Sequence, residues 1–181
     1  RMGGIAGHAG LFSTAHDLQI FARMLLGKGR VGTTRVLSEA SVRAMTSPQT
    51  PAGMTSVRGL GWDIDTSYSS NRGDLYPVGP SYGHTGFTGT SLWVDPTSNS
   101  YVLFLSSRLH PDGTGDVGVL RSKIATVAAG IIYGGSTTVL RAFDERSTEG
   151  RSSVRRTYVE PSPNERRTTL AGIDVLARDG F

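Results

Sequence analysis

The chain has 181 residues, enough for one domain and a tail, with 37% apolar residues, 19% charged residues and 24 glycines. Its net charge of +4 is spread over the whole chain, so no basic stripe indicates nucleic-acid binding. The absence of cysteine excludes disulfides, thiolate metal sites and a cysteine nucleophile, and no run reaches the ~18 apolar residues of a membrane span. The chain starts at Arg1 without an initiator methionine, and we expect it to be a piece of a longer protein.

Two helices are expected in the first fifty residues. Thr14 and Asp17 have the spacing of an N-cap and its reciprocal acid, and the helix that follows should end at Gly27. A second, shorter helix is expected over Ser38–Met45, capped by its first residue and ended ahead of Pro48. The apolar face of the first helix consists of Leu18, Phe21, Met24 and Leu25.

The middle of the chain favours strands. Leu60, Trp62 and Ile64 alternate with small or acidic residues, which predicts a half-buried strand, and the polar segment 66–80 is typical of a loop. The turn sequence DPTSNS joins the last two of the remaining strands and predicts an antiparallel hairpin. These remaining strands are expected at about 82–87, 90–95 and 101–107.

A third helix is expected over 116–133, where apolar residues recur at helical spacing until Gly134. A helix with so apolar a face must pack on something, and the hairpin is the natural partner. We therefore predict an α+β domain over residues 1–135, with an antiparallel sheet and a packed C-terminal helix.

The character of the chain changes after residue 135. Residues 136–168 are polar, mixed in charge and without periodicity, and we interpret them as a solvated linker. An apolar pattern returns only at the end, and we interpret 169–181 as the start of a second domain. Its apolar positions are Leu170, Ile173, Val175 and Leu176.

The segment YGHTGFTGT places glycines and a histidine against a strand, although glycine weakens strands. It can be a turn that happens to carry His84. Alternatively, the main chain is kept bare because a ligand docks there, as a tetrahedral oxyanion requires of its N–H donors. From spacing alone, the ordinary turn is favoured.

Four segments in order shift this balance: GGIAGHAGLFSTAHDLQIFARMLL, GLGW, YGHTGFTGTSLWVDP and YVLFLSSR. Over about residues 1–133 the chain resembles the C-terminal half of the serine β-lactamase-like family, which groups class C β-lactamases, penicillin-binding proteins, D-aminopeptidases and related esterases. GLFSTAHDLQIF resembles the family's helix after a glycine turn. GHTGFTGT resembles its third motif, usually Lys-Thr-Gly, which many members replace with His-Thr-Gly.

The resemblance implies a partial β-lactamase/transpeptidase-like fold and acyl transfer through a serine ester, without cofactor or metal. His84 and Thr85 would face the polar end of a substrate and assist proton movement. Gly86 would keep the strand open, and the N–H of Phe87 would be one oxyanion-hole donor. The substrate would be a small molecule or peptide, such as a cell-wall peptide or a β-lactam-like compound. The family also implies a periplasmic or extracellular location.

The sequence departs from the family pattern in two motifs. No serine is followed by lysine three positions later, and Tyr-x-Asn is absent, since YSSN at Tyr68–Asn71 has the wrong spacing. In the family both motifs precede the GLFSTA helix. We therefore expect them upstream of Arg1, and we expect the 181 residues alone to be inert.

Other candidate residues have plainer interpretations. His8, His16 and His110 are expected in turns or in solvent, and no pair has the spacing of a zinc site. Trp62 and Trp93 are expected in the core. Arg108 could reach an anionic substrate, but a surface ion pair is favoured.

The end of the chain, LAGIDVLARDGF, resembles the opening of an exo-acting N-acetylmuramidase-like domain. Three functions thus compete: a serine hydrolase, a non-catalytic binding module on the same fold, and a domain that escorts a C-terminal peptidoglycan glycosidase. A Ser-x-x-Lys motif upstream would favour the hydrolase. The sequence does not indicate the oligomeric state.

Overall fold

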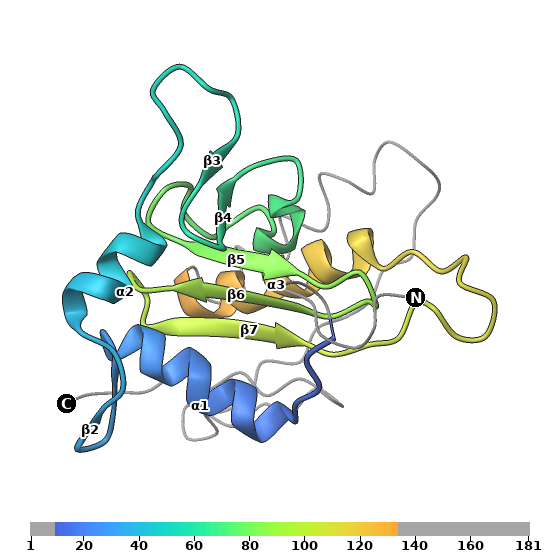
Figure 1. The fold of residues 1–181 in the computed structure, drawn as a ribbon. Helices are drawn as coiled ribbons and strands as arrows, with labels where there is room; N and C mark the ends of the chain where they lie inside the picture. Colours follow the sequence, from blue (N-terminus) through green and yellow to red (C-terminus); the bar gives the residue numbers. More distant parts are fainter. Residues whose placement is uncertain (1–9, 134–181) are drawn as a thin grey trace, which may run out of the picture.

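The computed structural model describes residues 10–133 (Figure 1). His8, the expected linker over 136–168 and the expected second domain over 169–181 lie outside the described residues. In chain order the elements are α1 (Ala15–Leu26), β1 (Arg30–Val31), β2 (Thr34–Arg35), α2 (Glu39–Thr46), β3 (Val57–Arg58), β4 (Asp63–Asp65), the 3₁₀ helix η1 (Ser69–Arg72), β5 (Tyr82–Thr85), β6 (Ser91–Asp95), β7 (Ser100–Phe104) and α3 (Gly118–Tyr133).

The caps of the first two helices are those that the sequence predicts. The Thr14 hydroxyl accepts a hydrogen bond from the Asp17 N–H at 3.1 Å and begins α1. The Ser38 hydroxyl accepts from the Ser41 N–H at 2.9 Å and begins α2. The expected apolar face of α1 is only partly buried, because Phe21 remains 37% exposed and stacks on the ring of Trp62.

Five strands form one antiparallel sheet in the order β3-β4-β5-β6-β7. The predicted hairpin is confirmed: β6 and β7 pair from Ser91↔Phe104 to Asp95↔Ser100. The expected strands at 82–107 are present but shorter, because the chain turns away from the sheet after Thr85 and after Phe104. The α+β class is therefore confirmed.

Side chains that alternate along the strands build a core on each face of the sheet. On one face Tyr82 and Val94 pack with residues of α1, and on the other Trp93 and Val102 pack with residues of α3. Figure 1 shows the sheet between these two helices. The prediction that the last helix packs on the hairpin is confirmed, as is the burial of both tryptophans.

Polar contacts fix α3 along its length. Near its C-terminal end, the Tyr133 hydroxyl donates to the carboxylate of Asp95, which is fully buried in the β6–β7 hairpin. Midway, the Thr126 hydroxyl accepts from the main-chain N–H of Asp74 at 3.0 Å. Each contact joins residues far apart in sequence, so α3 has a defined position and register on the sheet.

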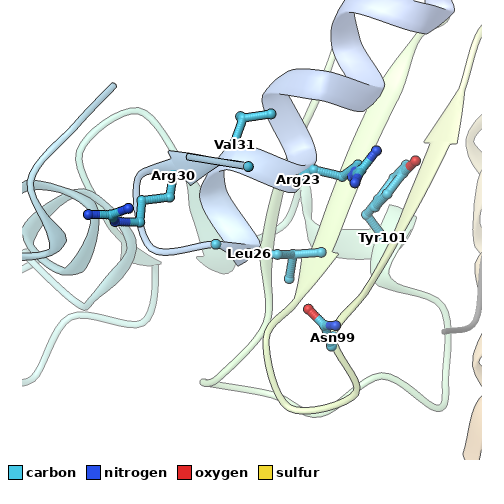
Figure 2. Close-up of a pocket in the computed structure, with 8 residues that line it drawn as sticks. Arg23, Leu26, Arg30, Val31, Asn99 and Tyr101 are labelled. Carbon is cyan, nitrogen blue, oxygen red and sulfur yellow. The ribbon is translucent and has the colours of Figure 1, made fainter. Parts of the chain in front are cut away.

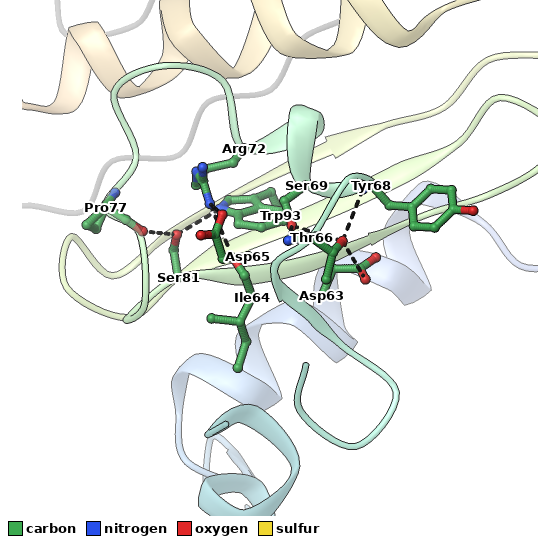
Figure 3. A network of polar contacts seen from close by, with 10 residues as sticks. All are labelled: Asp63, Ile64, Asp65, Thr66, Tyr68, Ser69, Arg72, Pro77, Ser81 and Trp93. Atoms are coloured by element: carbon green, nitrogen blue, oxygen red, sulfur yellow. Dashed lines mark hydrogen bonds and ion pairs between the residues drawn. The ribbon is translucent and has the colours of Figure 1, made fainter. Parts of the chain in front are cut away.

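Residues 66–80, expected as a loop, contain η1 and a polar network that holds it against the sheet (Figure 3). Arg72 donates to the Ile64 carbonyl at 3.2 Å and to Asp65 at 3.1 Å. The Trp93 indole N–H donates to the Ser81 hydroxyl at 3.0 Å. Periodicity does not reveal such a segment, because side-chain hydrogen bonds rather than an apolar stripe hold it in place.

Candidate active site

Close approach of protein atoms explains the glycines of the segment YGHTGFTGT. A Cβ at Gly83 would lie 2.2 Å from Cε3 of Trp93, and one at Gly86 would lie 2.2 Å from the Thr90 hydroxyl. Gly89 has a φ of +119°, which other residues rarely adopt. A side chain at Gly86 would therefore meet Thr90 of the same turn first.

Beyond Gly83, the outer side of β5 has no partner strand among the described residues. Although β5 lies inside the sheet, β4 pairs with it only at Asp63↔Gly83. The Gly86 N–H donates to the Thr90 carbonyl at 2.6 Å, so the main chain at positions 84 and 86 faces β6. By the alternation of an antiparallel ladder, the N–H and C=O of Thr85 face the opposite side, beyond the end of β4.

The ring of His84 is held at this edge by the main chain. Its Nδ1 lies 2.7 Å from the carbonyl oxygen of Thr85. A carbonyl oxygen can only accept, so Nδ1 carries the proton and donates it. In the neutral imidazole Nε2 is then free to accept a proton. The side chain is exposed, so Nε2 is accessible to a reacting group.

Thr85 does not share a face with His84. Successive residues of a strand point to opposite faces, which places His84 with Tyr82 on the α1 face and Thr85 on the α3 face. The side chain of Thr85 is half-buried. The two predicted site residues therefore meet at the edge of β5 from opposite sides, and a ligand must lie along the edge to touch both.

Phe87 follows in the tight turn between β5 and β6. Within the part of the chain that the structure describes, no acceptor lies on its N–H, whereas its carbonyl accepts from Arg108 Nε at 2.7 Å. The Arg108 guanidinium also lies 4.6 Å from the centre of the Phe87 ring, which is 71% exposed. Among the described residues Arg108 forms no ion pair, contrary to the expectation, and its Nη1 donates to the Gly115 carbonyl at 2.8 Å.

Two residues that contact this site are not predicted from the sequence. Arg121 of α3 donates to the carbonyls of Gly86 at 3.1 Å and Gly89 at 3.2 Å. Asn71 of η1 donates to the His84 carbonyl at 3.4 Å. Burial lowers the pKa of the Arg121 guanidinium, but an arginine remains charged at neutral pH. Neither residue lies in a motif, so only the tertiary structure identifies them.

A cavity of about 340 Å³ lies at the other end of the sheet, beside the last turn of α1, β1 and the β6–β7 turn (Figure 2). Its walls include Arg23, Leu26, Asn99 and Tyr101. None of the predicted site residues lines it. As the described residues form it, the candidate site is an exposed strand edge, separate from this cavity.

Metal-ligand clusters and membrane-spanning helices are both absent from the described residues. Between residues 10 and 133, no three His, Asp or Glu side chains gather as metal ligands would. In the same range no helix has the length and apolar composition needed to cross a bilayer.

Comparison with known proteins shows the family of the chain. The family model described as "Beta-lactamase" matches residues 1–123. Proteins of Salmonella paratyphi B, Salmonella newport and Salmonella heidelberg named "Putative D-alanyl-D-alanine carboxypeptidase" are each 34% identical over 110 residues, 60% of this chain. The chain spans about a quarter of the length of these relatives, since the match covers 25% of each. The family model matches well over half of the 181 residues, and the chain therefore belongs to the beta-lactamase family.

Proposed function

We propose that this chain forms the strand side of the active site of a serine hydrolase, which transfers an acyl group through a serine ester. The observation that carries the proposal is the edge of β5 beyond Gly83. There the main chain of Thr85 faces outward, and His84 Nε2 has no proton in the neutral ring. Family membership and the name of the Salmonella relatives support the same reaction.

In this mechanism the nucleophilic serine attacks the carbonyl carbon of an amide or ester, and the carbonyl oxygen becomes an oxyanion. The N–H of Phe87, which has no acceptor among the described residues, donates to that oxyanion. His84 Nε2 takes up a proton near the nucleophile and returns it to the leaving group. Thr85 orients the polar end of the substrate from the other face of β5.

The serine itself comes from outside the printed sequence. No serine among the 181 residues has lysine three positions later. Among the described residues, the hydrogen-bond partner of the His84 ring is the Thr85 carbonyl and not a serine hydroxyl. The 181 residues alone are therefore inert in this proposal. The substrate class is a cell-wall peptide or a β-lactam-like amide, and the protein acts in the periplasm or outside the cell.

The test compares variants of the full reading frame that carries this chain. His84→Ala should lower kcat for an acyl-transfer substrate by about 10²-fold or more, the usual contribution of a general acid–base group. Thr85→Val should lower turnover less, because the change removes only an orienting hydroxyl. Both should keep the free energy of unfolding within about 1 kcal/mol, because His84 is exposed and Thr85 is only half-buried.

Matched controls exist in the same chain. His16→Ala removes an exposed histidine of α1, and Thr34→Val removes an exposed threonine of β2, which belongs to a different sheet from β5. Neither should change kcat. If His84→Ala retains full activity, the role of His84 is refuted and the segment YGHTGFTGT is an ordinary turn. If the full protein binds the substrate without turnover, the chain belongs to a binding module.

A further inference from the structure

Two arginines hold the turn that follows the His-Thr-Gly triplet. Arg121 reaches the turn from α3 and donates to the carbonyl oxygens of Gly86 and Gly89. Arg108 reaches it from the segment after β7 and donates to the carbonyl of Phe87 at 2.7 Å. Three of the four carbonyls of the turn Gly86–Gly89 thus accept from arginine side chains. The fourth, that of Thr88, accepts from the main-chain N–H of Arg108 at 2.9 Å.

The contact with Gly86 also fixes a direction. The peptide between Gly86 and Phe87 is trans, since the cis peptide of the described residues is at His110–Pro111. In a trans peptide the C=O and N–H point in opposite directions. Because the Gly86 oxygen faces Arg121 and the Gly89 N–H, the Phe87 N–H must face away from them, toward the open side of β5.

We propose that Arg121 is a positioning residue that aims the Phe87 N–H at the reacting carbonyl. The inference rests on the proposed serine hydrolase function, in which that N–H is an oxyanion donor. A cationic donor on the Gly86 oxygen also polarises the peptide and makes its N–H a stronger donor, by about 10–30% for each such bond in a chain. Arg121 therefore acts through the turn on both the direction and the strength of the donor.

A positioning role of Arg121 can be distinguished from a merely structural one, because each carbonyl that Arg121 contacts also has a second hydrogen-bond donor. The Gly86 oxygen also accepts from the Gly89 N–H at 3.1 Å, and the Gly89 oxygen also accepts from the Ser106 hydroxyl at 2.7 Å. Removal of the guanidinium leaves both carbonyls with a donor. The side chain is only 9% exposed and its Nε and Nη2 are occupied by the turn, so it is not presented to a substrate.

The experiment uses the full reading frame and compares Arg121→Gln with Arg35→Gln. Arg35 is a matched control because it also donates to two main-chain carbonyls, those of Lys28 at 3.3 Å and Leu37 at 3.0 Å. It belongs to β2, which Figure 1 shows on the side of the molecule opposite to the C-terminal end of β5. Loss of an oxyanion donor costs about 10²–10³-fold in kcat, and a misdirected donor should cost at least about 10-fold with KM unchanged. Arg121→Lys should recover only part of the loss, since an ammonium cannot serve both carbonyls as the guanidinium fork does.

Two further measurements test the positioning role of Arg121 separately from the proposed hydrolase function. The affinity for a boronic acid that forms a tetrahedral serine adduct should fall with kcat in Arg121→Gln and stay unchanged in Arg35→Gln. In protein labelled with ¹⁵N-phenylalanine, the Phe87 amide signal should shift in Arg121→Gln but not in the control, whether or not the enzyme is active.

Equal kcat and equal boronate affinity in the two variants would overturn the inference while the hydrolase function stands. If the unmodified protein shows no acyl transfer, the proposed function fails, and the amide signal decides the positioning claim. An unchanged Phe87 signal in Arg121→Gln then refutes it, and a shifted one supports it.

Discussion

Gly83→Ala should destabilise the fold more than Gly86→Ala in the segment YGHTGFTGT. The glycine lies in β5 opposite Trp93, and the indole of Trp93 packs across the position that a side chain would occupy. An alanine Cβ would lie 2.2 Å from Cε3 of the indole and 2.4 Å from the Leu92 carbonyl oxygen. Carbon atoms in contact are normally about 3.5–4.0 Å apart, so the strands must separate by more than about 1 Å.

Neither the Trp93 indole nor the Leu92 carbonyl can move easily to make room for a Cβ. Trp93 is 1% exposed and its N–H is bonded to Ser81, and the Leu92 carbonyl belongs to the main chain of β6. Overpacking a dense core costs about 1–3 kcal/mol, and two immobile neighbours place this change at about 3 kcal/mol. Domains are stable by only about 5–15 kcal/mol, so the loss is a large share of the total.

Urea unfolding measures this prediction directly. With a slope of about 2 kcal/mol per molar, a loss of about 3 kcal/mol moves the midpoint by about 1.5 M. Gly118→Ala is the matched control, because the nearest atom to its added Cβ is a flexible Asp116 carboxylate oxygen at 3.3 Å and the position begins α3. It should be neutral or stabilising. A loss below about 0.5 kcal/mol for Gly83→Ala would refute the packing argument.

Two other predictions concern the same sheet. Burial raises the pKa of the Tyr82 phenol from its usual value of about 10 to about 12. The neutral phenol therefore stabilises the fold fully below about pH 10, and up to about 2–3 kcal/mol of the free energy of unfolding is lost as the pH rises toward 12. Urea midpoints between about pH 9 and about pH 11.5 should therefore fall more steeply for the unmodified protein than for Tyr82→Phe, and equal slopes would exclude the buried phenol as the cause. Gly86→Ala should be destabilising by about 1–2 kcal/mol, because its Cβ meets the Thr90 hydroxyl, and Thr90→Ala should recover most of that loss. Independent, additive effects of the two substitutions would show that Thr90 is not the obstacle.

Local sequence signals predict the parts of this fold that depend on neighbours along the chain. The caps at Thr14 and Ser38, the β6–β7 hairpin and the helix that packs on it all follow from turn chemistry and apolar spacing. The two-residue strands β1, β2 and β3 are too short to show a period, so they are missing from the expectation.

The site is predictable only in part, for a physical reason. The motif identifies His84 and Phe87, but their geometry depends on contacts between distant residues. Arg121 reaches Gly86 across 35 positions of sequence, and Arg108 reaches Phe87 across 21. A local sequence pattern does not show which distant carbonyl an arginine side chain contacts. For the same reason, the sequence leads us to expect a surface ion pair for Arg108 instead of its hydrogen bonds to carbonyls.

Covalent labelling of the full reading frame by a β-lactam tests the central claim most directly. Intact-protein mass spectrometry should show one stoichiometric acyl adduct, on a serine that lies outside the 181 residues and precedes a lysine by three positions. The adduct should form more slowly in His84→Ala, and the 181 residues expressed alone should remain unlabelled. An adduct on a serine between Arg1 and Phe181, or equal rates of labelling with and without His84, would contradict the assignment of the β5 edge to acyl transfer.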